Sequence, residues 1–372
     1  MHNCGISVDK NYTEHFSLSV NGKCDTICLN YNENCMDIET LIQTSKQLMK
    51  KGKGILAADE SEATAGNRLK SIGVQNTEEN RRLYRDLFLS TPGIGKYLNG
   101  VILHDETLRQ KNNEGLSFVD VLTKQDILPG IKVDKGVVDF EGFPGEKITE
   151  GLDGLRERLN EYYSLGARFA KWRSVIAIGE NIPTLEAIHA NAVSMARYAH
   201  LCQEEGLVPI IEPEVLLNGN HTIEKAEEVT TRVVSEVMRE LKDLRVDLRA
   251  VILKTSMVLP GDESGQEVSS ETIAKATARM LKNAVPAEIP GVVFLSGGQD
   301  EISATKHLDA IADLEPLPWE ITFSYARALQ GPALEIWKGR DENIPAARNE
   351  FLKRLELNTA ADLGKYDSSK EN

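Results

Sequence analysis

Short apolar, β-branched runs recur along the chain and alternate with segments of helical periodicity. Eight such runs occur, at 52–60, 100–106, 130–136, 168–175, 207–215, 248–257, 291–299 and 319–327. Between them, apolar residues repeat every three or four positions, as in 183–205 and 223–241, which predicts amphipathic helices. Strict alternation of strand and helix indicates parallel strands. Because no GxGxxG loop follows the first strand, the pattern predicts a (β/α)8 TIM barrel, with an added helix at each end, rather than a doubly wound sheet.

The same pattern predicts three regions. We expect a weakly ordered N-terminal extension over 1–36, a barrel domain over 37–366 and a disordered tail over 367–372. The extension holds four of the five cysteines, Cys4, Cys24, Cys28 and Cys35. Cys24 and Cys28 have a spacing that suits a metal, but no second ligand pair follows, so we expect no metal site there. An odd number of cysteines fits a reducing compartment, so we expect a cytoplasmic protein, with an organelle such as a plastid as the alternative.

The composition and net charge limit which partners the chain can bind. The chain is 41% hydrophobic and 27% charged, which is typical of a globular protein, and its net charge is −14. That charge argues against nucleic acid or an anionic membrane as a partner, and no apolar stretch approaches the roughly 20 residues that span a bilayer. Any phosphorylated substrate must therefore be attracted by a local cluster of Lys and Arg.

Charged residues gather where the predicted strands end. They are Asp59, Lys132 and Asp134, Lys171 and Arg173, Glu212 and Glu214, and Lys254. Barrel enzymes carry their reactive groups at these ends, and residues two apart point the same way, so we expect all eight in one cleft. The alternative is a charge-compensated layer that plugs the barrel, or, for Lys254 alone, a snorkelling or salt-bridged lysine. Interior layers are normally Val, Ile and Leu, and burying charge costs several kcal/mol per ion, so stability alone does not favour that alternative.

Two further clusters suggest phosphate binding. Ser296 and Gly297 follow the seventh strand and Arg327 follows the eighth, where this fold commonly binds phosphate. Ser61, Thr64 and Arg68, after the first strand, form a second, weaker candidate site that faces Lys132. The seven histidines show no metal-binding spacing. His104, the one histidine at a strand end, is best interpreted as a hydrogen-bonded structural residue.

These motifs resemble one known family. The segments GKGILAADES, GVILHDETL, GIKVDKG, FAKWRSV, IEPEV, LKTSMV, FLSGGQ and TFSYARALQ are similar to the class I (Schiff-base) fructose-bisphosphate aldolases. The resemblance implies a homotetrameric, metal-independent lyase of glycolysis or gluconeogenesis that needs no cofactor. Such a lyase reversibly cleaves fructose 1,6-bisphosphate to dihydroxyacetone phosphate and glyceraldehyde 3-phosphate. Another sugar bisphosphate, such as sedoheptulose 1,7-bisphosphate, or an additional binding role remains an alternative.

The resemblance also implies roles for individual residues. Lys254 corresponds to the imine-forming lysine, Glu212 to the acid–base group, with Glu214 beside it, and Asp59 to the base that takes the C4 hydroxyl proton. Lys171 corresponds to a lysine that orients these carboxylates. The implied substrate and phosphate ligands are Lys132, Arg173, Ser296, Gly297, Arg327, Ser61, Thr64 and Arg81. A neutral amine near pH 7 requires that the pKa of Lys254 fall by roughly 3 units from its reference value of about 10.4. A change of that size corresponds to about 4 kcal/mol. We also expect the two neighbouring glutamates to repel each other, which raises the pKa of one of them.

Overall fold

The computed structural model describes residues 15–20, 23–28, 37–314 and 316–371. It divides the chain into two compact units, Met1–Met36 and Asp37–Asn372. In the first unit, β1 (His15–Val20) and β2 (Lys23–Cys28) pair as an antiparallel hairpin. The other residues of 1–36, with Cys4 and Cys35 among them, lie outside the described residues, so the weak order expected for the extension stays a prediction.

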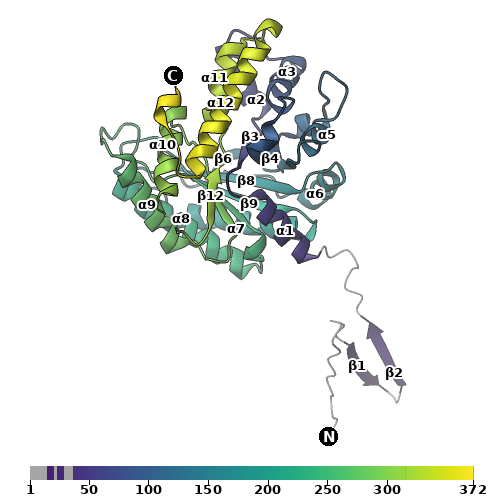
Figure 1. Ribbon diagram of the computed structural model, residues 1–372. Coiled ribbons are helices and arrows are strands. Elements are labelled where there is room, and N and C mark those ends of the chain that lie inside the picture. Colours follow the sequence, from purple (N-terminus) through teal and green to yellow (C-terminus); the bar gives the residue numbers. More distant parts are fainter. Residues whose placement is uncertain (1–14, 21–22, 29–36, 315, 372) are drawn as a thin grey trace. The chain divides into compact units, whose positions relative to one another are not determined.

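The second unit is built on eight parallel strands (Figure 1). They are β3 (Gly54–Ala58), β4 (Leu98–Leu103), β5 (Leu128–Lys132), β8 (Phe169–Ile176), β9 (Val208–Val215), β10 (Ile252–Thr255), β11 (Gly291–Phe294) and β12 (Glu320–Phe323). Neighbours in space are neighbours in sequence from β3 to β12. Ala57, at the first strand, donates its backbone N–H to the carbonyl of Tyr325, just past the last, at 3.0 Å. The predicted TIM barrel is confirmed.

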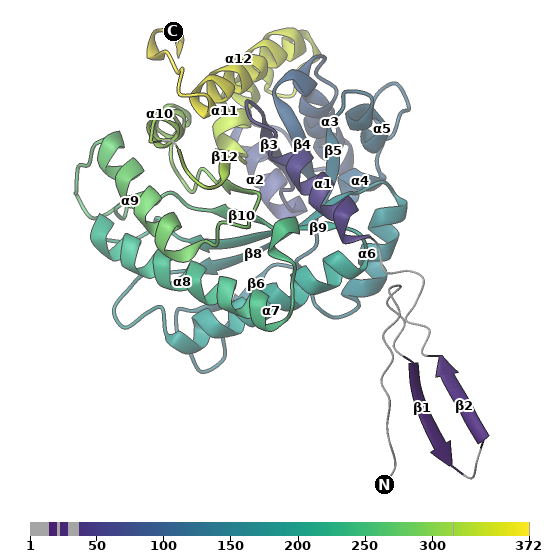
Figure 2. The ribbon, with the colours of Figure 1, turned by 60° about the horizontal axis from the view of Figure 1, so that its bottom comes forward.

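Helices surround the strands (Figure 2). They are α1 (Ile38–Leu48), α2 (Glu62–Ser71), α3 (Glu78–Leu89), α4 (Asp105–Arg109), α5 (Phe118–Thr123), α6 (Leu155–Ser164), α7 (Leu185–Glu204), α8 (Ile223–Asp243), α9 (Ser270–Ala284), α10 (Glu301–Ala312), α11 (Arg327–Trp337) and α12 (Ile344–Asp362). A short hairpin, β6 (Val137–Asp139) and β7 (Lys147–Thr149), interrupts the alternation after β5. Within the described part of the chain, no helix has the length and apolar character of a membrane span.

Apolar side chains fill one half of the barrel interior. Ile102, Phe169, Ile210 and Ile252 pack together there with residues of α1. Phe169 fits because Gly130 has no side chain: a Cβ at that position would lie 2.2 Å from the phenylalanine ring. The apolar layer and α1 close the end at which the strands begin, which leaves the opposite end for polar groups.

The C-terminal segment differs from the expected disordered tail. Ser368–Glu371 forms a short 3-10 turn, η4. Glu371 forms an ion pair with the buried Arg354 of α12 and accepts a hydrogen bond from the Tyr366 hydroxyl at 2.7 Å. The prediction of disorder was therefore wrong for these residues, because a long-range ion pair holds them.

Candidate active site

Each strand that carries a reactive group begins apolar and ends charged on the same inward face. In β9, the buried Val208 and Ile210 belong to the interior cluster, and Glu212 follows two residues later. In β10, Ile252 is followed in the same way by Lys254. Because alternate residues of a strand share a face, the apolar core itself aims these side chains at the mouth of the barrel. The same register places Asp59, Lys132, Lys171, Arg173 and Glu214 there.

Four of these groups form a continuous chain of ion pairs. The Nζ of Lys254 lies 3.1 Å from Oε1 of Glu212, and Oε2 of Glu212 lies 2.6 Å from Nζ of Lys171. Lys171 also donates to Oδ2 of Asp59 at 2.9 Å. All four residues are at most 9% exposed. Buried charges of this kind need partners, and the chain supplies one for each.

Burial and neighbouring charges set the protonation of this chain. Burial lowers the pKa of Lys254 below its usual value, and Arg173 adds to that effect, while Asp59 and Glu214 oppose it. Burial acts in the opposite sense on Asp59, but Lys171 and Lys254 outweigh it and hold the pKa of that carboxyl well below its usual range. The amine therefore loses its proton more readily than an exposed lysine does, and the carboxyl of Asp59 is ionised at neutral pH.

The remaining charges at the mouth pair locally. Arg173 forms an ion pair with Glu214, and Nζ of Lys132 lies 2.6 Å from Oδ1 of Asp134. Glu212 and Glu214 were expected to perturb each other. The structure gives them separate cations: Glu212 pairs with Lys171 and Lys254, and Glu214 pairs with Arg173.

The paired charges border open space and do not plug the barrel. One cavity, of about 540 Å³, is lined by Lys254 and by the predicted phosphate ligands Ser296, Gly297 and Arg327. Gly297 and its neighbour Gly298 have φ of 54° and 101°, a left-handed backbone that glycine adopts without strain.

A second cavity, of about 600 Å³, is lined by the other predicted ligands, Ser61, Thr64 and Lys132. Asp59, Thr64, Lys171 and Arg173 line both cavities. Ser61 also caps α2, accepting from the Thr64 N–H. The two cavities are thus adjoining lobes of one cleft, with the ion-pair chain between them.

One predicted ligand lies outside this cleft. Arg81 lines neither cavity; its Nε donates to Oε2 of Glu106 at 2.9 Å, and its NH1 donates to Asn76. Conversely, the sequence reasoning missed Glu60, which is buried directly after Asp59 and lies 2.6 Å from NH1 of Arg85. Glu60 lines the second cavity beside Asp59, but it falls outside the period of two by which the strand-end charges were selected.

Other polar clusters lie elsewhere. Among the described residues, His189, Glu236 and Glu240 bring three metal-type ligand atoms within 4.8 Å of one another. Arg239 already forms ion pairs with both carboxylates, at 2.6 and 2.5 Å, so the cluster has its cation. It lines neither cavity of the cleft.

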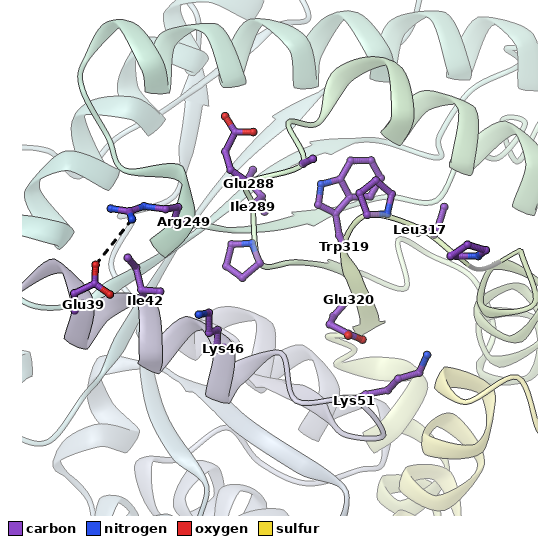
Figure 3. Close-up of a pocket in the computed structure, with 14 residues that line it drawn as sticks. Glu39, Ile42, Lys46, Lys51, Arg249, Glu288, Ile289, Leu317, Trp319 and Glu320 are labelled. Carbon is purple, nitrogen blue, oxygen red and sulfur yellow. Dashed lines mark ion pairs between the residues drawn. The ribbon is translucent and has the colours of Figure 1, made fainter.

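A further hollow, of about 460 Å³, opens at the opposite end of the barrel, between α1 and the starts of β11 and β12 (Figure 3). Charges of both signs line it, among them Lys46 and Glu320, and Arg249 lies 3.9 Å from Glu39. None of the predicted site residues borders this hollow.

Comparisons with known proteins agree with this geometry. The family model "Fructose-bisphosphate aldolase class-I" matches residues 40–372. "Fructose-bisphosphate aldolase 4, cytosolic" of Arabidopsis thaliana is 52% identical over 88% of this chain and 83% of that protein. "Probable fructose-bisphosphate aldolase class 1" of Xylella fastidiosa (strain 9a5c) is 49% identical over 89% of this chain and 99% of that protein. The solved fructose-bisphosphate aldolase of Plasmodium falciparum superposes with a TM-score of 0.88 at 48% identity, covering 89% of this chain and 96% of that one. The chain therefore belongs to the class I fructose-bisphosphate aldolase family, the lyases that use a lysine Schiff base and no metal ion.

Proposed function

We propose that this cleft cleaves fructose 1,6-bisphosphate, with Lys254 as the imine-forming lysine. The observation that carries the proposal is the buried chain Lys254–Glu212–Lys171–Asp59, which lies between two cavities that carry phosphate-binding side chains. It combines a nucleophile, an acid–base group and a second base in one cleft, as an imine-forming lyase requires.

The contact between Lys254 and Glu212 supplies the first step. Transfer of one proton across this 3.1 Å contact yields a neutral amine and a protonated carboxyl group at once. The amine attacks the C2 carbonyl to give a carbinolamine. Glu212 then protonates the departing hydroxyl group, water leaves, and the iminium ion forms. Burial, which lowers the pKa of Lys254, favours the transfer.

Asp59 serves the second step. Its carboxylate takes the proton of the C4 hydroxyl group, the C3–C4 bond breaks, and the electron pair moves into the iminium group to form an enamine. Glyceraldehyde 3-phosphate leaves. Protonation of C3 and hydrolysis of the imine then release dihydroxyacetone phosphate. Lys171, within 2.9 Å of both Asp59 and Glu212, holds the two carboxylates in place, so it is a positioning residue.

The two cavities give the substrate a direction. Lys254 shares its cavity with Ser296, Gly297 and Arg327, which suits the C1 phosphate next to the imine carbon. The cavity beyond Asp59 holds Ser61, Thr64 and Lys132, which suits the C6 phosphate. Arg173 lines both cavities and lies between the two ends.

We also propose a cytosolic homotetramer. A cytosolic relative at 52% identity supports the location, and a chloroplastic relative of Chlamydomonas reinhardtii at 48% identity represents the alternative. Size-exclusion chromatography with light scattering measures the mass of the assembly, which we expect to be that of four chains.

The activity itself is tested by following aldehyde release from fructose 1,6-bisphosphate for the natural protein and for Lys254→Met. Without the amine no imine forms, so we expect at least about a 1000-fold loss of kcat. A matched variant of an exposed lysine, Lys275→Met, should retain full activity, and so should the natural protein in EDTA. More than a tenth of the activity in Lys254→Met, or its loss in EDTA, would contradict the proposal.

A further inference from the structure

His104 is a cleft histidine that has no part in the steps above. It follows β4, the strand between β3 and β5. Ile102 belongs to the interior cluster, so His104, two residues later, continues the same inward face. It lines the cavity that also holds Asp59 and Lys132, on the side away from Lys254.

Among the residues that the structure describes, the imidazole of His104 makes no contact that stabilises the fold through a hydrogen bond. His104 stands at the N-cap of α4 but makes no side-chain capping hydrogen bond, and within the described ranges no other group pairs with it. The structural, hydrogen-bonded histidine expected from the sequence is therefore not what the structure shows.

The predicted phosphate ligands around this cavity are already engaged. Lys132 has Asp134 as its partner at 2.6 Å, and the Ser61 and Thr64 hydroxyls lie 3.1 Å apart in a hydrogen bond with each other. A ligand must compete for those groups, whereas the ring N–H of His104 can donate without giving up a protein partner.

Charged groups of both signs lie near His104. Burial lowers its pKa, and Lys132 and Arg85 act in the same direction, while Glu106 and Asp59 oppose them. A neutral imidazole at pH 7 still offers one N–H donor. A phosphate dianion beside it raises the affinity of the ring for a second proton, which strengthens the contact.

We propose that His104 determines specificity by donating a hydrogen bond to the C6 phosphate of the substrate. This inference rests on the proposed function, in which Lys254 fixes C2 in one cavity and the C6 end enters the other. The residue favours a bisphosphate over a substrate that carries phosphate at C1 alone.

The test compares fructose 1,6-bisphosphate with fructose 1-phosphate for the natural protein and for His104→Phe. Losing a hydrogen bond to a charged group lowers kcat/KM by about 10- to 100-fold. We therefore expect the ratio of kcat/KM for the bisphosphate over the monophosphate to fall by that factor, through KM. His104→Asn, which keeps an N–H donor, should restore part of the ratio. His200→Phe, on the exposed side of α7, should not change it.

The outcomes separate two failures. An unchanged ratio in His104→Phe, or equal losses on both substrates in both variants, overturns the role of His104. If the natural protein forms no borohydride-trapped adduct at Lys254, the proposed function itself fails. If His104→Phe does not fold, His104→Asn alone decides, since a purely structural role predicts no split between the two substrates.

Discussion

Replacing Lys171 with methionine removes the cation that joins the two buried carboxylates. Lys171 lies 2.9 Å from Asp59 and 2.6 Å from Glu212, and its side chain is 4% exposed. Glu212 keeps Lys254 as a partner, at 3.1 Å, whereas Asp59 loses its ion pair. Removing one partner of a buried pair typically destabilises a protein by about 3–5 kcal/mol. We expect a loss of that size in Lys171→Met at pH 7.5.

The loss should depend on pH in a defined direction. In the natural protein the pKa of Asp59 lies below its unfolded value of about 3.9, so its stabilising effect is present above that value and unchanged between pH 7.5 and 5. In the variant, only Lys254 and Lys132 oppose the effect of burial on Asp59, so we expect its pKa to rise above the unfolded value. The charged carboxyl then destabilises the fold above the raised pKa. The difference between the two proteins should therefore shrink at pH 5, by up to about 1.4 kcal/mol per pH unit below the raised pKa.

Urea unfolding followed by far-UV circular dichroism at pH 7.5 and pH 5 measures the difference, at one protein concentration because assembly affects stability. Lys275→Met is the matched control. Its ammonium lies 2.5 Å from Glu271 on an exposed face of α9, and ion pairs in full contact with solvent contribute little to stability. A loss below about 1 kcal/mol in Lys171→Met, or a loss equal at both pH values, would refute the reasoning.

Two further changes test the cleft. Glu212→Gln keeps the size of the side chain, but its amide cannot accept the proton of Lys254. We therefore expect trapping of the imine with borohydride to slow by about 100-fold or more. A change below threefold would exclude Glu212 as the acid. Gly298→Ala puts a Cβ on a residue with φ of 101°, 3.3 Å from Leu217. The strain should distort the loop that holds Ser296 and Gly297, so we expect KM for fructose 1,6-bisphosphate to rise several-fold. An unchanged KM would show that this loop does not bind the phosphate.

The barrel was predictable because its signals are local. Eight apolar runs separated by helical periodicity specify the strands, and the period of two within a run points out which charges face inward. Glu212 and Lys171 were found in this way. The hairpin β6–β7 was missed because its strands are three residues long and Val137 and Val138 are exposed, so they lack the buried pattern that marks a strand.

The pairing of the charges was not predictable, because it depends on the stagger of neighbouring strands. That stagger gives Glu212 two lysines and leaves Glu214 with Arg173. The order of the C-terminal turn was equally hidden: Glu371 and Arg354 are 17 residues apart in sequence and meet only through packing. Local periodicity carries no information on either contact.

Covalent trapping tests most directly whether Lys254 forms the imine. The protein is incubated with dihydroxyacetone phosphate and borohydride, and the modified residue is mapped by mass spectrometry. We expect one reduced adduct, at Lys254, whose pKa is lowered and whose Nζ contacts a carboxylate that can accept its proton. An adduct at Lys171, the other buried lysine of the cleft, or no adduct at all, would contradict the central claim.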